Sequence, residues 1–467
     1  MSLADQPLSP LDGRYHAAVA VLGEYLSEAG LNRARVHVEV EWLIFLTDRA
    51  MFGSSSLEAN QKQALRALVT DFDDASVAAL AAHEARTRHD VKAVEYFVRD
   101  QLDALGLNGV AELTHFACTS EDINNLSYAL TVKDAVTRVW LPKLNTVIGR
   151  VTELAEAHRS VPMLARTHGQ PATPTTMGKE LAVFAYRLGR ITQQVAASDY
   201  LGKFSGATGT FAAHVAADPT ADWPAISREF VESLGLTWNP LTTQIESHDW
   251  QAELYARVSH ANRVLHNLAT DIWTYISLGY FRQIPVAGAT GSSTMPHKIN
   301  PIRFENAESN LELSSALLDS LGATLVTSRL QRDLTDSSSQ RNIGVGFGHS
   351  LLALDNLERG LGEIALDEAA LAADLDANWE VLAEAIQTVI RAEVVAGRSQ
   401  IADPYAQLKD LTRGRRIGAV ELAEFVDALD IGAEAKQRLL GMTPASYIGL
   451  ADELVDRLDT SHLDSSH

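Results

Sequence analysis

Residues 254–275 of the chain read LYARVSHANRVLHNLATDIWTY. Apolar side chains recur in this stretch at alternating steps of three and four, which places them along one face of an α-helix. These side chains are Leu254, Val258, Ala261, Leu265, Leu268, Ile272 and Tyr275. His260, Arg263 and Asn267 fall on other faces of the same helix. The stretch therefore predicts a long helix that buries a single apolar stripe.

Three further stretches repeat this spacing, whereas strand patterns are sparse. Their apolar positions are Leu141, Leu144, Ile148, Val151 and Ala155, then Met177, Leu181, Phe184, Leu188, Ile191 and Val195, and finally Leu311, Leu318, Leu321 and Leu325. The last stretch follows Asn300-Pro301, where Asn can cap a helix and Pro suits its first turn. Long helices with one apolar stripe each bury it against one another. We therefore expect an all-α protein with a central bundle of long helices.

The expected domain organisation follows from chain length and from helix breakers. A chain of 467 residues is long enough for about three domains. Two segments rich in Gly and Pro, residues 166–176 and 285–301, interrupt the long helices. We expect three consecutive helical domains: an N-terminal domain over residues 1–112, a central long-helix bundle over 113–362 and a C-terminal domain over 363–467.

Charge and cysteine content exclude several classes of protein. Asp and Glu number 60 against 39 Lys and Arg, and the formal charge of −21 argues against binding to nucleic acid or to an anionic membrane. A single cysteine, Cys118, cannot form an internal disulfide or a Cys-rich metal site. The first residues lack a signal-peptide pattern, and no stretch reaches about 18 uninterrupted apolar residues. We expect a cytoplasmic protein.

Residues 291–301, GSSTMPHKINP, place two serines and a lysine just before a predicted helix start. Backbone N–H groups at a helix start, together with Lys298 and Asn300, could bind a carboxylate and stabilise negative charge on it. By composition alone, a flexible Gly/Ser linker is an equally good interpretation. The pattern Ser-Ser-x-Met-Pro-x-Lys-x-Asn-Pro, with Glu305 after it, resembles the signature loop of the fumarase/aspartase superfamily.

That resemblance implies the superfamily fold and its chemistry. Most members cleave a C–N or C–O bond beta to a carboxylate and release fumarate. By resemblance Ser292 is the base that removes a carbon-bound proton, and Ser293 binds substrate. A serine hydroxyl is a weak base that needs neighbours such as Lys298 and loop amides to favour its alkoxide. Neither a metal nor another cofactor is expected.

Two segments near the N-terminus resemble the adenylosuccinate lyase family, close to its longer bacterial form. Residues 9–15, SPLDGRY, match the opening motif of the family, although alone they would be interpreted as a turn. Residues 89–95, HDVKAVE, match a second motif. The resemblance implies substrate contacts for Arg14, Tyr15, His89 and Asp90. Arg88 stands where relatives commonly have a small polar residue, so a contact of Arg88 is left open.

Two polar tetrapeptides add to the resemblance. Residues 119–122, TSED, form a capping-box pattern, and a helix start is their simplest interpretation. In the family the Thr-Ser pair contacts the succinyl carboxylates, which assigns Thr119 and Ser120 to that role. Residues 243–246, TQIE, match the family segment in which Gln contacts substrate, and this is Gln244.

His168 lies in residues 167–172, THGQPA, inside the first Gly/Pro-rich segment. A lone histidine is more often structural. The segment is similar to the His-Gly-Gln-Pro-Ala motif of the family, which implies that His168 is the general acid that protonates the leaving nitrogen. The near-neutral reference pKa of histidine suits this task.

Residues 329–342, RLQRDLTDSSSQRN, concentrate three arginines and a run of hydroxyls in an acidic protein. A solvated turn is the simplest interpretation. Guanidinium groups and hydroxyls are also the groups that bind a phosphate. The resemblance assigns the phosphate-bearing end of the substrate to this segment, through Arg332, Ser337 and Arg341.

Together these motifs imply a C–N lyase of purine nucleotide biosynthesis. The implied reactions convert adenylosuccinate to AMP, and the succinylcarboxamide intermediate SAICAR to AICAR, each with release of fumarate. The family also implies a homotetramer whose active sites are shared between subunits. Two alternatives stay open: another fumarate-releasing enzyme such as argininosuccinate lyase, and a non-catalytic helical scaffold of the same fold. Whether Arg303 contacts substrate is also left open.

Overall fold

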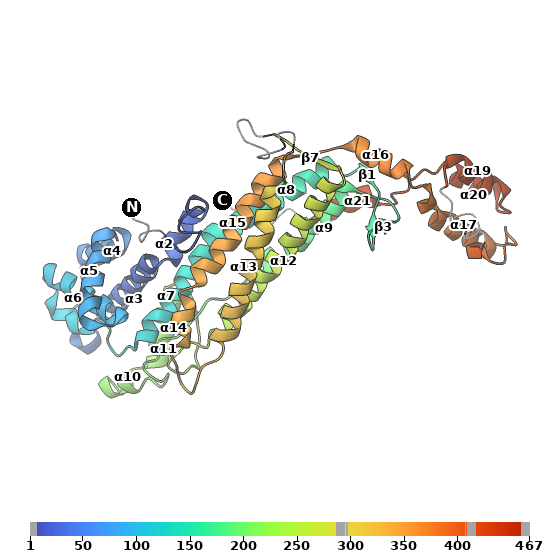
Figure 1. Cartoon of the computed structure of the whole chain (residues 1–467). Coiled ribbons are helices and arrows are strands. Elements are labelled where there is room, and N and C mark those ends of the chain that lie inside the picture. Colours follow the sequence, from blue (N-terminus) through green and yellow to red (C-terminus); the bar gives the residue numbers. More distant parts are fainter. Residues whose placement is uncertain (1–6, 286–294, 296–297, 407, 409–416, 459–467) are drawn as a thin grey trace. The chain divides into compact units, whose positions relative to one another are not determined.

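The computed structural model describes residues 7–285, 295, 298–406, 408 and 417–458, which are predominantly helical (Figure 1). The predicted all-α class is confirmed. The helices up to residue 135 are α1 (His16–Val19), α2 (Gly23–Leu26), α3 (Glu28–Asp48), α4 (Ala59–Thr70), α5 (Asp74–Thr87), α6 (Asp90–Ala104) and α7 (Ser120–Ala135). Those from residue 141 to residue 362 are α8 (Leu141–Ala157), α9 (Met177–Ala196), α10 (Ala212–Ala217), α11 (Trp223–Ser233), α12 (Asp249–Ser277), α13 (Ile302–Leu325), α14 (Thr335–Gln340) and α15 (Ile343–Gly362).

The remaining elements are short. In the described part of the chain after residue 367, the helices are α16 (Glu368–Asp376), α17 (Ala383–Val395), α19 (Ala419–Ala428), α20 (Ala433–Leu440) and α21 (Ala451–Leu454). The 3-10 helices are η2 (Ala20–Leu22), η3 (Met51–Gly53), η4 (Asn108–Leu113), η6 (Trp379–Leu382) and η7 (Val455–Arg457), and η5 (Val136–Trp140) is a π-helical turn. None of the helices in the described ranges is long and apolar enough to cross a membrane.

Each strand in the described ranges has two or three residues, and each sheet there consists of two strands. The antiparallel pairs are β1 (Pro162–Met163) with β4 (Thr175–Thr176), β2 (Arg166–Thr167) with β3 (Gln170–Pro171), and β7 (Phe281–Gln283) with β8 (Ile364–Leu366). β5 (Leu201–Gly202) and β6 (Thr237–Trp238) pair in parallel. The Gly/Pro-rich segment 166–176 therefore contains the β2–β3 pair and the strand β4.

The residues group into two compact units that are interleaved along the chain. The first unit comprises Met1–Leu144, Ile191–Arg263 and Ser309–Asp355, and the second comprises Asn145–Arg190, Val264–Glu308 and Asn356–His467. This grouping does not test the division into three consecutive domains at residues 112 and 362, which stays a prediction.

The predicted apolar stripes are buried, apart from Tyr275 in α12, which is half-buried. Within α12, Leu254, Val258 and Leu265 have no exposed surface, whereas Arg263 is exposed. The parts of α12, α13 and α15 that belong to the first unit run side by side (Figure 1), and buried hydrogen bonds join them. Asn262 Nδ2 donates to Ser314 Oγ at 2.9 Å, and Ser350 Oγ donates to Asn262 Oδ1 at 2.8 Å. Polar side chains inside the bundle thus fix how the helices align.

The start of α13 differs from the prediction by about one residue. The helix begins at Ile302, and the Pro301 carbonyl accepts the N–H groups of Phe304 at 3.1 Å and Glu305 at 3.3 Å. Pro301 therefore holds the capping position that was predicted for Asn300. A proline fits there because it supplies an acceptor and has no N–H to satisfy.

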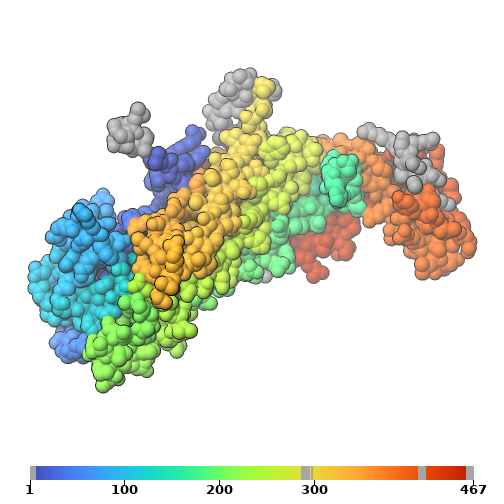
Figure 2. Space-filling model, turned by 60° about the horizontal axis from the view of Figure 1, so that its bottom comes forward, coloured from blue at the N-terminus to red at the C-terminus, as the bar shows by residue number. Residues whose placement is uncertain are grey.

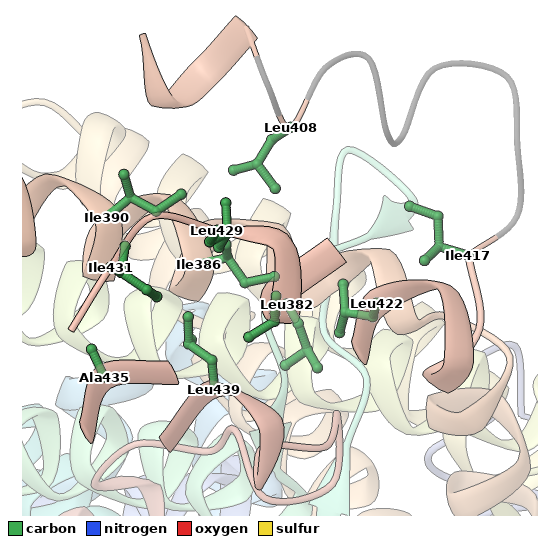
Figure 3. Close-up of a cluster of buried hydrophobic side chains, with 11 residues drawn as sticks. Leu382, Ile386, Ile390, Leu408, Ile417, Leu422, Leu429, Ile431, Ala435 and Leu439 are labelled. Carbon is green, nitrogen blue, oxygen red and sulfur yellow. The ribbon is translucent and has the colours of Figure 1, made fainter. Parts of the chain in front are cut away.

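A separate hydrophobic cluster lies in the C-terminal part of the second unit (Figure 3). Its buried members are Leu382, Ile386, Ile390, Leu408, Ile417, Leu422, Val426, Leu429, Ile431, Ala435 and Leu439. They come mainly from α17, α19 and α20, so these three short helices form a core of their own.

Candidate active site

Thr119 and Ser120 lie at the start of α7, where the predicted capping box is confirmed. The Thr119 side chain accepts the Asp122 N–H, and Asp122 Oδ2 accepts the Thr119 N–H at 2.8 Å. Both hydroxyl-bearing residues are half-buried. The positive end of a helix dipole favours bound anions, so this position suits recognition of a carboxylate.

A buried ion pair holds this helix start in place. Lys203 Nζ lies 2.8 Å from Asp122 Oδ1, and neither side chain has exposed surface. Asp122 also accepts the N–H groups of Ser205 at 2.9 Å and Gly206 at 3.1 Å. A buried carboxylate is stable only when paired and hydrogen-bonded in this way. The pair therefore ties residues 203–206 to the first turn of α7.

Arg332 and Gln244, two predicted substrate contacts, meet next to the same turn. Arg332 Nη2 lies 2.9 Å from Glu121 Oε1, and Arg332 Nη1 donates to Gln244 Oε1 at 3.4 Å. The Gln244 amide nitrogen in turn donates to the Ala207 carbonyl at 3.0 Å. The structure thus brings Arg332 and Gln244 together beside Glu121 of α7, although 88 positions separate the two in sequence.

Asp90 and Arg341, two further predictions, form a second contact. Asp90 Oδ2 accepts from Arg341 Nη2 at 3.1 Å and from Arg35 Nη2 at 2.8 Å. Burial raises the pKa of the Asp90 carboxyl, but the two guanidinium groups and the Val91 N–H outweigh it and hold that pKa below its ordinary value. Asp90 is therefore an anion that orients both arginines. Arg341 also forms an ion pair with Glu28.

The structure places Arg35, a residue that the motifs did not single out, between Asp90 and Asn124. Its side chain is 1% exposed, and it donates to Asn124 Oδ1 at 2.9 Å as well as to Asp90. The signal was present, because Leu31, Arg35 and Val38 follow the spacing of one buried helix face. A charged residue inside an apolar stripe indicates a buried polar partner.

The remaining predicted contacts of the first unit lie nearer the surface. Arg14 is exposed, with its guanidinium carbon 5.9 Å from the centre of the Tyr15 ring. His89 caps α6, where Nδ1 accepts the Lys92 N–H at 3.3 Å. Ser337 is half-buried in α14. The stretch that contains α14 lies at the surface, as the amber region of Figure 2 shows.

A cavity of about 160 Å³ lies beside the opening motif. Ser9, Asp12, His16, Ser27 and Arg341 contribute polar groups to its lining, and most of the other lining residues are apolar, such as Leu11 and Leu22. Arg341 therefore borders both this cavity and Asp90. The cavity is therefore mainly apolar, with one arginine and one aspartate on its wall.

His168 belongs to the second unit and lies at the tip of a hairpin. His168 and Gly169 connect β2 to β3, and both have left-handed backbones, with φ of 54° and 73°. Two such residues form the tight turn that matches the twist of paired strands. A left-handed backbone costs a non-glycine residue about 1 kcal/mol. The His168 ring is exposed, so the turn presents the imidazole outward.

Ser292 and Ser293 lie outside the described residues. Lys298 is exposed and Asn300 is half-buried. The Lys298 N–H donates to the Met295 carbonyl at 2.9 Å, and the Ile299 carbonyl accepts from the Gln283 amide at 3.0 Å. The end of the signature segment is therefore anchored to β7.

Two arginines whose roles were left open have defined settings. Arg303 pairs with Glu363 at 3.5 Å and donates to Asn356 at 3.5 Å. Arg88 is exposed and ends α5 with a left-handed backbone, φ 53°. In the described part of the chain, no group of three or more His, Cys, Asp or Glu side chains could hold a metal ion.

Comparison with known proteins gives consistent results. A family model described as Lyase matches residues 13–312, and one described as Adenylosuccinate lyase C-terminal matches residues 328–448. The adenylosuccinate lyase of Vibrio cholerae is 48% identical over 454 residues, which covers 97% of this chain and 98% of that protein. The enzyme of the same name from Escherichia coli K12 is 48% identical over 453 residues, with the same coverage of both chains.

Solved structures show similarity of fold. The 3-carboxy-cis,cis-muconate lactonizing enzyme of Pseudomonas putida superposes with a TM-score of 0.72 at 21% identity, covering 95% of this chain and 97% of that chain. A fumarate lyase of Mesorhizobium sp. BNC1 gives a TM-score of 0.73 at 19% identity, with coverage of 94% and 96%. At these identities the likeness concerns the fold alone.

Proposed function

Since the chain belongs to the adenylosuccinate lyase family, we propose that Ser292 and His168 are the base and the acid of its reaction. The activity is that of the family, the elimination of fumarate from adenylosuccinate to leave AMP and from SAICAR to leave AICAR. The proposal concerns which residues of this chain carry out the steps. One observation supports the substrate contacts proposed below: Asp90, Arg332 and Arg341, which are distant in sequence, are joined in one polar network.

The elimination requires two proton transfers. Ser292 removes a proton from the carbon next to a carboxylate, and the electron pair of that C–H bond forms the double bond of fumarate. The C–N bond breaks, and His168 gives its proton to the departing nitrogen. Lys298 and backbone N–H groups of the signature segment stabilise the extra negative charge on the carboxylate. Ser293 and Asn300 bind substrate in the same segment.

The two ends of the substrate need different groups. Thr119 and Ser120 contact the succinyl carboxylates at the start of α7, with Gln244 beside them. Arg332, Ser337 and Arg341 bind the phosphate-bearing end, together with Arg14 and Tyr15. His89 and Asp90 complete this list of proposed contacts. Local cations thus counteract a net charge of −21, which would otherwise repel an anionic substrate.

We further propose a homotetramer whose active sites combine segments of different subunits. The long helices α9, α12 and α13 support this, because each of them also carries an apolar side chain that is exposed. Tyr186 on α9 is 51% exposed, Trp273 on α12 is 40% exposed and Leu313 on α13 is 50% exposed. Exposed apolar side chains suit contact with further copies of the chain. A cytoplasmic location also stays a prediction.

One assay tests the activity. Purified protein is incubated with adenylosuccinate, with argininosuccinate or with buffer, and release of fumarate is followed. We expect fumarate from adenylosuccinate alone. Fumarate from argininosuccinate would instead favour the related lyase, and no fumarate from either would favour a non-catalytic scaffold.

A further inference from the structure

The buried guanidinium of Arg35 joins two groups of proposed substrate contacts. Its three nitrogen atoms each have one acceptor: Nε donates to Asn124 Oδ1 at 2.9 Å, Nη1 to Asn32 Oδ1 at 2.9 Å and Nη2 to Asp90 Oδ2 at 2.8 Å. With 1% of its side chain exposed, the arginine is held within the protein. All these residues belong to the first unit.

Two series of hydrogen-bonded residues, here called arms, start at Arg35, and the first arm leads to Arg341. Asp90 Oδ2 accepts from Arg35 and also from Arg341 Nη2 at 3.1 Å, so a single carboxylate oxygen binds both cations. The other oxygen of the Asp90 carboxylate, Oδ1, accepts the N–H of Val91 in the first turn of α6 at 2.9 Å. The carboxylate can therefore not rotate freely, and it transmits the position of Arg35 to Arg341.

The other arm leads to Arg332. The Asn124 amide oxygen accepts from Arg35, and its nitrogen donates to Glu121 Oε1 at 2.8 Å. The same Glu121 oxygen lies 2.9 Å from Arg332 Nη2. Glu121 is 3% exposed and Arg332 is 18% exposed, so this arm runs from the interior toward the surface.

We infer that Arg35 is a positioning residue that sets the two phosphate-binding arginines, Arg332 and Arg341, relative to each other. The inference rests on the proposed function, in which these two arginines bind the same end of the substrate. A phosphate held by two guanidinium groups needs both at fixed positions. Arg35 touches neither of them and acts through Asp90, Asn124 and Glu121.

Only arginine offers this geometry. A planar guanidinium directs donors to three sides at once, whereas a lysine ammonium is a compact charge on a flexible stem. A lysine at position 35 would keep the charge near Asp90 but could not donate to Asn32, Asp90 and Asn124 in the same directions. The variant Arg35→Lys therefore keeps the positive charge of the side chain and removes its hydrogen-bond geometry, so it tests the geometry alone.

The first test compares Arg35→Lys with Arg33→Lys. Arg33 lies on the same helix, is 31% exposed and pairs with Glu24, so it is a matched control. For Arg35→Lys we expect KM for both purine substrates and Kd for AMP to rise about tenfold, the order expected when hydrogen bonds to charged groups are lost. We expect kcat and the Ki of fumarate to change little, because fumarate lacks the phosphate. Arg33→Lys should match the wild type.

A second variant keeps the inference testable if Arg35→Lys fails to fold. Asn124→Ala interrupts the arm to Arg332 and leaves the contact of Arg35 with Asp90. It should weaken AMP binding by less than Arg35→Lys does. If both act through one network, the double variant should lose less AMP affinity than the product of the two single losses.

The outcomes separate this inference from the proposed function. Wild-type protein that releases no fumarate would contradict the function itself. Active wild type, with AMP affinity and KM unchanged in Arg35→Lys and in Asn124→Ala, would overturn the inference alone. A fall in kcat or in melting temperature with unchanged AMP affinity would also overturn it, because it would assign Arg35 a purely structural role.

Discussion

Arg332 Nη2 lies 2.9 Å from Glu121 Oε1, and this ion pair ties the connection between α13 and α14 to the first turn of α7. The carboxylate is almost fully buried, whereas part of the guanidinium is exposed. Glu121 therefore holds one edge of Arg332, Gln244 accepts from Nη1, and only the exposed part of the guanidinium is left for another anion. The pair links the residue proposed for phosphate binding to the helix start proposed for carboxylate binding.

Arg332→Ala should raise KM for both substrates by about tenfold or more while kcat falls less, because a charge-assisted contact to the non-reacting end is lost. Steady-state kinetics with each substrate measures this. Arg329→Ala is the control, because Arg329 lies in the same segment, is 83% exposed and pairs only with Asp333 among the described residues. An unchanged KM for Arg332→Ala would remove this arginine from the site.

Ser292→Ala and His168→Ala should each lower kcat by about two to four orders of magnitude, since each removes a proton-transfer group, and binding of substrate should largely survive.

If different subunits supply Ser292 and His168, mixing and reassembling the two inactive variants restores active sites that have both residues. For equal amounts we expect roughly a quarter of wild-type activity. Confirmed subunit exchange without recovery would place both residues in one chain or contradict an assignment. Full activity of Ser292→Ala would instead point to Ser293 or another base.

Light scattering at assay concentration should give four times the mass of one chain. Tyr186→Glu, which places a charge among the exposed apolar groups of α9, should shift the protein toward smaller species and lower its activity. Val395→Glu is the control, because Val395 is 90% exposed at the end of α17, outside the long helices. A monomer with full activity would contradict the shared-site proposal.

Stability should fall as the pH drops below about 6.5, the ordinary pKa of histidine. His214 is buried against Trp223, with both ring nitrogens unpaired among the described residues, and burial lowers its pKa. The unfolded chain therefore binds a proton that the folded protein resists, so acid favours unfolding. His214→Phe should reduce the loss of Tm between pH 7.5 and 5.5. The same change at the exposed His260 is the control, and an identical pH dependence for wild type and His214→Phe would contradict the prediction.

The long helices were predictable from the sequence because their signal is local. The spacing of Leu254, Val258 and Leu265 requires only that one face of α12 be buried, whatever it packs against. The capping box at Thr119 was predictable for the same reason, since its partners are three residues apart. The start of α13 was placed less well, because Asn300 and Pro301 both suit a helix start and the backbone hydrogen bonds decide between them.

The candidate site was only partly predictable. The resemblance of the motifs assigned substrate contacts to Arg332, Arg341 and Asp90. Nothing in the spacing of these residues shows that they share one network. Arg35 and Lys203 were identified as part of the site only from the tertiary structure.

The amino-acid sequence by itself determined the helical class, the long apolar stripes and the family motifs, because periodicity and short motifs depend on neighbours along the chain. The tertiary structure alone decided which buried charges meet. Lys203 and Asp122 are 81 positions apart, and Arg35 and Asn124 are 89 positions apart. A buried charge is stable only with a partner within hydrogen-bond distance, and that distance is a property of the folded chain.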